Sequence, residues 1–392
     1  MTRLVPPRRG FPSAEYEARA ARAQRLMSEQ GVDGLVLTSP PNVRYVSGFD
    51  TQFWESPTRP WFVVLPRAGG PIAIVPEIGA PGMGVTWVRD IRTWPAPRPA
   101  DDGVSLLTAA LAQLPRRFGR VGWELGRESI VRMPIIDYLR VKDGLAGLAF
   151  VDGTPIIRAL RGVKSPAEIE RLRFICQTVS DGFEALTGKL AIGDSERDAC
   201  RKLRIEFLER GADGSPYLIG VAGPGGYDNI IMGPTDRRIE RGDVLIIDTG
   251  TTFDGYYCDF DRNFAFGPAT DAARRAHETV WDATEAGIRA ARPGATTTDL
   301  WRAMMRVLEA GGSLGNNVGR MGHGLGLQLT EPPSNMPGDD TPIVADMVLT
   351  IEPGMEYAPG KMIVHEENIV VREDGAELLS RRAPREMWIV DA

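Results

Sequence analysis

Acidic side chains interrupt apolar, strand-like runs in the second half of the chain, and this feature constrains the fold more than any other. Burying a carboxylate costs several kcal/mol unless it is paired or bound to a cation. The fold must therefore gather these acids around positive charge. They are Asp248 and Asp259 in VLIIDTGTTFDGYYCDFDRNF (244–264), Glu352 in LTIEPGMEY (349–357), and Glu366 with Glu367 in MIVHEENIVV (362–371).

The first pair of acids has two interpretations. Asp248 ends the apolar run VLIID, and Asp259 follows eleven residues later, beyond a turn that contains Asp254-Gly255. Two antiparallel strands joined in this way can aim both carboxylates at one point. The alternative is that Asp248 merely ends a strand and Asp259 is solvated, although several aromatic residues surround Asp259 in the sequence. Both interpretations stay open for this pair alone.

A histidine between two glycines completes the pattern. His323 lies in MGHGLGLQLTEPPSN (321–335), and the chain has only two other histidines. Oxygen donors with a single imidazole suit Mn, Co, Fe or Zn rather than a thiolate zinc site. So much negative charge favours two divalent cations over one. We interpret Gly322 and Gly324 as residues that let His323 come close to a metal cluster.

Composition narrows the classes of partner. The chain has 52 acidic and 46 basic residues, and its net charge of −6 argues against a nucleic-acid partner. Three scattered cysteines fit a reducing compartment. No apolar stretch approaches the roughly 20 residues of a membrane span. We therefore expect a cytoplasmic protein that does not associate with membranes.

The length of 392 residues favours two domains. Strands and helices alternate over residues 1–157, which predicts an α/β domain. Residues 158–392 are expected to form a second, α+β domain, whose first helix carries a capping box of Ser165 and Glu168. The glycine-rich segment 220–229 lacks the features of a phosphate loop and is predicted to be a tight loop near a site. Apolar spacing predicts helices near 13–30, 104–114, 128–141, 195–210, 271–291 and 297–310, with mostly strands after 321.

Four motifs in this order resemble those of the metallopeptidase family with the pita-bread fold, which includes Xaa-Pro dipeptidases, aminopeptidase P and methionine aminopeptidase. The motifs are IIDTGTTFDGYYCDFDR, GHGLGLQLTEPP, TIEPGMEY and HEENIVVREDG. NVRYVSGF is similar to the creatinase-type N-terminal domain of the same family, and LRGVKSPAEIERLR to the helix that opens its catalytic domain. The resemblance implies an α/β creatinase-type domain followed by a pita-bread catalytic domain.

The resemblance also implies a ligand set for two divalent metal ions of unknown identity, with manganese among the candidates. Asp259 and Glu366 would bridge both ions, Asp248 would bind one, and His323 with Glu352 the other. Glu367 is the substitute for Glu366, because strand alternation lets only one of these neighbours face the metals. Two such cations, about 3.5–4 Å apart, lower the pKa of a bridging water from 15.7 toward about 7. Glu352 is then the expected proton shuttle to the leaving nitrogen.

The chain departs from the family at positions that orient the substrate. Thr330 and Ile231 stand where peptidases of this family usually carry two further histidines, and Val364 stands where an arginine is common. These departures weaken the inference to a proline-peptide substrate.

The sequence also bears on three residues close to these motifs or in the preceding helix. His365 would face away from the metals in a structural or supporting role if Glu366 faces them. His277, in a helix rich in Arg and Glu, is predicted to lie at the surface. Asp261 could be a carboxylate close to the ligands or could pair with Arg262, and the sequence does not decide between them.

The favoured function is a dinuclear metallohydrolase, similar to an Xaa-Pro dipeptidase, that acts on a dipeptide or small-molecule substrate as a homodimer. A first alternative keeps the fold and acts on a small non-peptide compound, as dimethylsulfoniopropionate lyase, creatinase and ectoine hydrolase do. A second is a non-catalytic binding module. The five ligand positions count against the metal-free amidinohydrolases and against a binding module, because neither needs a carboxylate cage.

Overall fold

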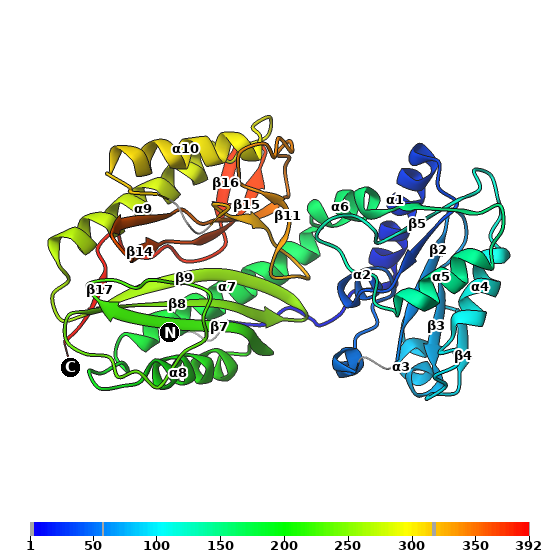
Figure 1. The fold of residues 1–392 in the computed structure, drawn as a ribbon, viewed down its shortest axis with the longest axis horizontal. Helices are drawn as coiled ribbons and strands as arrows, with labels where there is room; N and C mark the ends of the chain where they lie inside the picture. Colours follow the sequence, from blue (N-terminus) through cyan, green and yellow to red (C-terminus); the bar gives the residue numbers. More distant parts are fainter. Residues whose placement is uncertain (1–3, 57–58, 316–318, 392) are drawn as a thin grey trace. The chain divides into compact units, whose positions relative to one another are not determined.

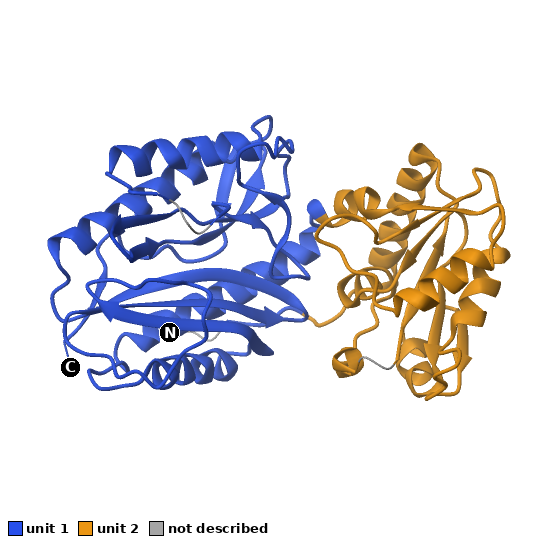
Figure 2. Ribbon diagram, in the orientation of Figure 1, with its two compact units in different colours: residues 1–7, 162–392 blue, residues 8–161 orange. Residues whose placement is uncertain are grey.

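The computed structural model describes residues 4–56, 59–315 and 319–391. The chain divides into two compact units, of which unit 2 comprises Arg8–Arg161 and unit 1 comprises Met1–Pro7 with Gly162–Ala392 (Figure 2). Each unit has its own sheet system and its own apolar core.

Unit 2 is built on a mixed six-stranded sheet with the order β4-β3-β2-β1-β5-β6. β1 is antiparallel to β2 and parallel to β5, and every residue of β1, β2 and β3 is buried. The strands are β1 Gly34–Leu37, β2 Phe62–Pro66, β3 Ile72–Pro76, β4 Asp90–Trp94, β5 Arg120–Trp123 and β6 Ala149–Asp152. The helices are α1 Ser13–Gln30, α2 Pro40–Ser47, α3 Ala80–Gly84, α4 Val104–Ala112, α5 Ile135–Asp143 and α6 Thr154–Gly162, with short 3-10 turns at Gln52–Glu55 and Glu77–Gly79.

Unit 1 has two main sheets. One is a four-stranded sheet of three long antiparallel strands with a short fourth strand at the edge next to β9 (Figure 1). Its strands are β7 Gly214–Pro224, β8 Asp243–Phe253, β9 Tyr256–Phe266 and the short β17 Trp388–Val390. The five-stranded sheet has the order β11-β10-β12-β15-β16, and β13-β14 form a separate pair. These strands are β10 His323–Gly324, β11 Glu331–Ser334, β12 Val348–Ile351, β13 Gly354–Ala358, β14 Lys361–Val364, β15 Glu367–Arg372 and β16 Gly375–Leu378.

Four helices cover these sheets. α7 (Pro166–Leu186) and α8 (Glu196–Glu209) pack on the four-stranded sheet. α9 (Asp271–Ala290) and α10 (Thr297–Ala310) share one apolar core with β12 and β15 of the five-stranded sheet. The metal-ligand candidates therefore lie in unit 1, on or directly next to strands whose sheets are covered by helices.

The structure departs from the sequence prediction in the glycine-rich segment. Residues 220–224 belong to β7, so the predicted tight loop is wrong for this half of the segment. Gly220 pairs with Ile247 of β8, and a Cβ at Gly220 would lie 2.5 Å from the Cys200 sulfur. Pairing with β8 and close packing on α8 therefore explain glycine here better than turn formation does.

The strand-like runs of residues 349–357 and 362–371 are each interrupted in the structure. The first breaks at Glu352-Pro353 and the second at His365-Glu366. Proline cannot donate a backbone hydrogen bond, which explains the first break. Both breaks fall on predicted ligand positions, so these acids lie at strand ends rather than inside a ladder.

Among residues 4–56, 59–315 and 319–391, no helix is both long enough and apolar enough to span a membrane.

The first helix of unit 1, α7, depends on its capping box. The Ser165 hydroxyl accepts a hydrogen bond from the Glu168 backbone N–H (3.3 Å), and the Glu168 carboxylate accepts one from the Ser165 N–H (2.9 Å). We expect Ser165→Ala to lower the free energy of unfolding of unit 1 by about 1 kcal/mol, since it removes an N-cap acceptor. Urea denaturation measures this loss. Ser28→Ala, on the exposed side of α1, is the control, and equal stability of both variants would contradict the prediction.

Candidate metal centre

β8 and β9 place three carboxylates on one face of the four-stranded sheet. Asp248 lies directly opposite Asp261 in the antiparallel register, and Asp259 lies opposite Gly250. Residues two apart in a strand share a face, so Asp259 and Asp261 point to the same side as Asp248. The hairpin predicted from the sequence thus brings its acids to one surface.

The five-stranded sheet contributes the remaining candidates from its strand ends. His323 begins β10, Glu352 follows β12 directly, and Glu366 precedes β15. The Glu352 backbone N–H donates to the carbonyl of Met321 (3.2 Å), which ties the segment after β12 to the segment before β10. The site is therefore assembled from both sheets.

Three of the five predicted ligands meet in the buried interior. Asp259, His323 and Glu366 each offer one ligand atom, and these atoms all lie within 4.8 Å of one another. The His323 Nε2 lies 3.4 Å from the Asp259 Oδ2. The charges of Asp248 and Glu352 act on this group, because each raises the pKa of the Glu366 carboxyl. The five predicted residues thus form one electrostatic cluster.

The orientation of His323 suits metal binding. Its Nδ1 lies 2.8 Å from the carbonyl oxygen of Gly324, an acceptor that favours the tautomer with hydrogen on Nδ1. The Nε2, on the side of Asp259, then carries the free lone pair. A backbone carbonyl commonly fixes a metal-binding histidine in this way.

The glycines beside His323 have a structural reason that differs from the expected one. A Cβ at Gly322, whose φ is 112°, would lie 2.1 Å from the Thr350 carbonyl oxygen. A Cβ at Gly324 would lie 2.4 Å from the Pro332 carbonyl oxygen. β10 lies between β11 and β12. The glycines therefore let the backbones of these two strands come close to the backbone beside His323.

Burial and mutual repulsion perturb the acids of the cluster. Burial, together with the charge of Asp259, raises the pKa of Asp248 to about 8. Burial and the neighbouring acids raise the pKa of Glu352 to about 8 as well, against the opposing effect of His323. Burial also raises the pKa values of Asp259 and Glu366 well above the ordinary range. Without cations, these carboxyls retain protons near neutral pH.

Unsatisfied oxygens show that the cluster fits divalent metal ions. The Asp248 Oδ1, the Asp261 Oδ2 and the Glu366 Oε1 are buried and have no hydrogen-bond partner among the described residues. Buried polar atoms in native proteins normally have partners, so each of these requires an explanation. Carboxylate oxygens beside an imidazole nitrogen form a donor set for Mn, Co, Fe or Zn.

Asp261 is a further acid of this cluster. The Arg262 guanidinium donates to the backbone carbonyl of Asp261 (2.6 Å) and forms its ion pair with Glu367 (3.1 Å). Burial and the charges of Asp248 and Glu352 raise the pKa of the Asp261 carboxyl well above its usual value. Of the two alternatives from the sequence, the structure favours the carboxylate close to the ligands.

Glu366 and Glu367 have different partners, as alternation predicts. Glu366 joins Asp259 and His323, whereas Glu367 contacts Arg262 and the His365 Nε2 (3.3 Å). His365 is fully buried on the side away from the metal-ligand candidates. This placement agrees with a structural role.

The surface location predicted for His277 is wrong. Its side chain is only 3% exposed, and its ring packs edge-on against the His365 ring at 6.0 Å between centroids. Burial and the neighbouring His365 lower the pKa of His277 to about 3. The Arg and Glu residues around it in the sequence mark the opposite face of α9, which a single helical segment does not reveal.

Two residues near the cluster were missed by sequence reasoning. Tyr217 of β7 pairs with Gly250, and its hydroxyl donates to the Ile230 carbonyl oxygen (3.4 Å) and lowers the pKa of the Asp248 carboxyl. Arg320 donates to the Ser334 hydroxyl (2.7 Å), and its charge lowers the pKa of Glu352. Neither belongs to a recognisable motif, and Tyr217 reaches the site only through the register of β7 with β8.

The three positions that differ from the family pattern have distinct environments. Ile231 is 75% exposed, and Thr330 is also exposed. Val364 is buried beside the cluster, and its backbone N–H donates to the Tyr227 hydroxyl (2.8 Å). The candidate ligands therefore lack the additional histidines and arginine of the family pattern.

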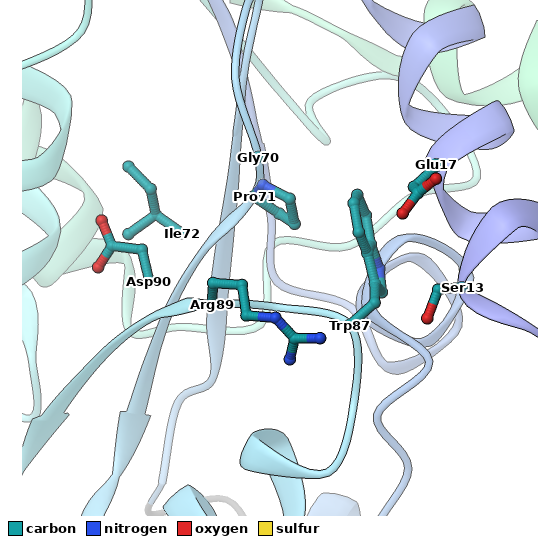
Figure 3. Close-up of a pocket in the computed structure, with 8 residues that line it drawn as sticks. All are labelled: Ser13, Glu17, Gly70, Pro71, Ile72, Trp87, Arg89 and Asp90. Carbon is teal, nitrogen blue, oxygen red and sulfur yellow. The ribbon is translucent and has the colours of Figure 1, made fainter.

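A separate cleft of about 470 Å³ lies wholly in unit 2 (Figure 3). It contains none of the predicted ligands, and its charged side chains have both signs. It is lined by Ser13, Glu17, Gly70, Pro71, Ile72, Trp87, Arg89 and Asp90.

Comparison with known families gives two matches. Residues 170–373 match metallopeptidase family M24, and residues 19–163 match the creatinase/prolidase N-terminal domain. A probable dipeptidase, PepE, from Mycobacterium tuberculosis is 29% identical over 388 residues, which cover 97% of this chain and 98% of that protein.

Solved structures show the same architecture. The dipeptidase PepE from Mycobacterium ulcerans has a TM-score of 0.85 and 28% identity, over 98% of this chain and all of that one. The prolidase from Thermococcus sibiricus has a TM-score of 0.85 with 24% identity, over 96% of this chain and all of that one. The predicted fold class, a creatinase-type domain followed by a pita-bread catalytic domain, is confirmed.

The raised pKa values make a prediction about stability. With metal removed by a chelator, the folded protein retains protons on Asp248 and Glu352 that the unfolded chain releases above about pH 4. Stability from these groups is complete below about pH 4 and is lost as the pH rises through about 8. We expect the free energy of unfolding to fall by about 1.4 kcal/mol per pH unit for each retained proton. The share of Glu352 is smaller because its side chain is partly exposed.

Urea denaturation of protein freed of metal by a chelator, between about pH 5 and pH 8, measures how steeply the free energy of unfolding falls with pH. Saturating Mn²⁺ should abolish this fall, because cations replace the protons. Glu352→Gln, which removes one titrating group, should reduce it. A metal-free protein that becomes more stable over this pH range would contradict the interpretation.

Proposed function

The chain belongs to metallopeptidase family M24, and on that premise we propose that it is a dinuclear metallodipeptidase that cleaves small dipeptides, Xaa-Pro dipeptides among them. The observation that carries the proposal is the buried meeting of Asp259, His323 and Glu366 within 4.8 Å, with uncompensated acids beside them. The relatives named as dipeptidases and prolidases support the same class of substrate.

Charge supports two ions rather than one. Four carboxylates of the ligand set carry four negative charges when ionised, and two divalent cations balance them. A single cation leaves a net charge of about −2 in a buried site, which is costly. The residues that would hold the ions are Asp248, Asp259, His323, Glu352 and Glu366.

When bound, such cations lower the pKa of water and polarise a carbonyl group. The protein then has to move protons and hold the substrate. Glu352 is suited to proton transfer, because its side chain is partly exposed while Asp259 and Glu366 are buried. We assign Glu352 as the group that accepts a proton from the attacking water and delivers it to the leaving nitrogen.

Other side chains hold this arrangement. The Gly324 carbonyl fixes the His323 ring, and the Tyr217 hydroxyl lowers the pKa of Asp248. Tyr217 is itself partly exposed. Its hydroxyl can orient an acid of the ligand set.

A small non-peptide substrate is the second candidate. It is favoured by Ile231 and Thr330, which leave the site without the two histidines of typical family peptidases. Assays of Mn²⁺-loaded protein with Xaa-Pro dipeptides, other dipeptides, dimethylsulfoniopropionate and creatine separate the candidates. Turnover of dimethylsulfoniopropionate or creatine without peptide cleavage would replace the dipeptidase proposal.

Asp259→Ala tests the ligand set directly. We expect it to lower both metal content and kcat/KM by on the order of a hundredfold or more, because it removes a carboxylate that would hold the ions. Metal content is measured by elemental analysis after purification without chelator. Asp271→Ala, an exposed acid at the start of α9, is the matched control. Full metal content and activity in Asp259→Ala would show that the ligands are wrongly assigned.

A further inference from the structure

The candidate ligands come from two sheets that share no backbone ladder among the residues that the structure describes. Asp259 belongs to the four-stranded sheet, and Glu366 directly precedes β15 of the five-stranded sheet. Residues held by a common ladder keep a fixed spacing, but this pair spans the boundary between two ladders. Something other than strand pairing must set the distance between these two acids.

The side chain of Asn368 makes the required connection. Its Oδ1 accepts a hydrogen bond from the Asp259 backbone N–H (2.9 Å), and its Nδ2 donates to the Asp259 carbonyl oxygen. An amide side chain presents one acceptor and a donor, as a peptide group does. Asn368 therefore replaces a neighbouring strand at the residue whose side chain faces the metals.

Other contacts fix the Asn368 side chain in place. It is fully buried, and the Cys176 thiol of α7 donates to its Oδ1 (3.3 Å). Its backbone pairs with Thr350 of β12, and its N–H donates to the Ser380 hydroxyl (3.0 Å). The amide is thus anchored in the five-stranded sheet, two residues from Glu366.

Arg262 makes the reciprocal connection from β9. Its guanidinium donates to the Glu366 carbonyl oxygen (3.1 Å) and pairs with the Glu367 carboxylate (3.1 Å). Arg262 is 1% exposed, so these contacts are shielded from water. A side chain from each strand therefore holds the backbone of the acid that the other strand contributes.

We propose that Asn368 is a positioning residue of the metal centre, whose amide fixes the backbone of Asp259 against that of Glu366 across the boundary between the two sheets. The inference rests on the ligand set proposed above. Metal sites require their ligands within about 0.5 Å of the productive geometry. Without the amide, the Asp259 backbone loses both partners and the spacing of the two acids is no longer set.

Asn368→Ala tests this role through metal binding rather than activity. We expect Mn²⁺ affinity, measured by isothermal titration calorimetry on chelator-treated protein, to fall on the order of tenfold to a hundredfold. Asn368→Ser, which keeps a small polar group in the same space, is the second variant if the alanine variant does not fold. It cannot bond both backbone groups of Asp259 and should also bind Mn²⁺ more weakly.

Asn42→Ala is the matched control. Asn42 is a buried asparagine of unit 2 whose Nδ2 donates to Glu124 (2.6 Å) and whose Oδ1 accepts from Arg161 (2.7 Å). Its loss should lower stability in urea without changing Mn²⁺ affinity, so it separates positioning from general destabilisation.

The outcomes are distinguishable. Weaker Mn²⁺ binding in the Asn368 variant but not in Asn42→Ala supports the inference. Affinity within about twofold of the unmodified protein overturns it and leaves the metal centre standing. Equal loss in both variants also overturns it, because the effect is then one of stability. If the unmodified protein binds no Mn²⁺, the proposed metal centre itself falls, and this inference with it.

Discussion

Repulsion among buried carboxylates is the constraint on which the catalytic unit depends. Asp248, Asp259 and Glu366 are all buried, and burial raises the pKa of each. Such a group is costly to assemble unless cations or protons compensate it. The two sheets, their covering helices and the side-chain links between them together oppose that repulsion. The site is therefore a region of local instability that the rest of the unit supports.

Much of this arrangement was predictable because its signals are local. The capping box at Ser165 marks the start of α7, and an acid within an apolar run is visible without any knowledge of the fold. Four such interruptions with a glycine-flanked histidine between them led to the ligand candidates. Their order along the chain carried the family resemblance, which the comparisons confirm.

What could not be predicted depends on contacts between distant segments. His277 is buried because α9 presses it against His365, and an isolated helix offers no sign of that partner. Tyr217 reaches Asp248 through the register of β7 with β8. The glycine-rich sequence of residues 220–224 is typical of a turn, and only the pairing with β8 shows that these residues form a strand. Asn368 follows two acids in an apolar run. The role of its amide becomes visible only from its hydrogen bonds to Asp259 in the four-stranded sheet.

The neighbours Glu366 and Glu367 show why the cation must come from outside the chain. Burial would raise the pKa of Glu367, but the Arg262 guanidinium, together with the neighbouring His365 ring and the hydrogen bond from the Ser380 hydroxyl, lowers it to about 2. Burial raises the pKa of Glu366 as well, and there the neighbouring acids raise it further. The protein thus places a buried arginine beside Glu367 and further acids beside Glu366. Within the part of the chain that the structure describes, Glu366 has no such positive partner and lies among buried oxygens that lack hydrogen bonds. A metal site requires this uncompensated negative charge before its ions bind.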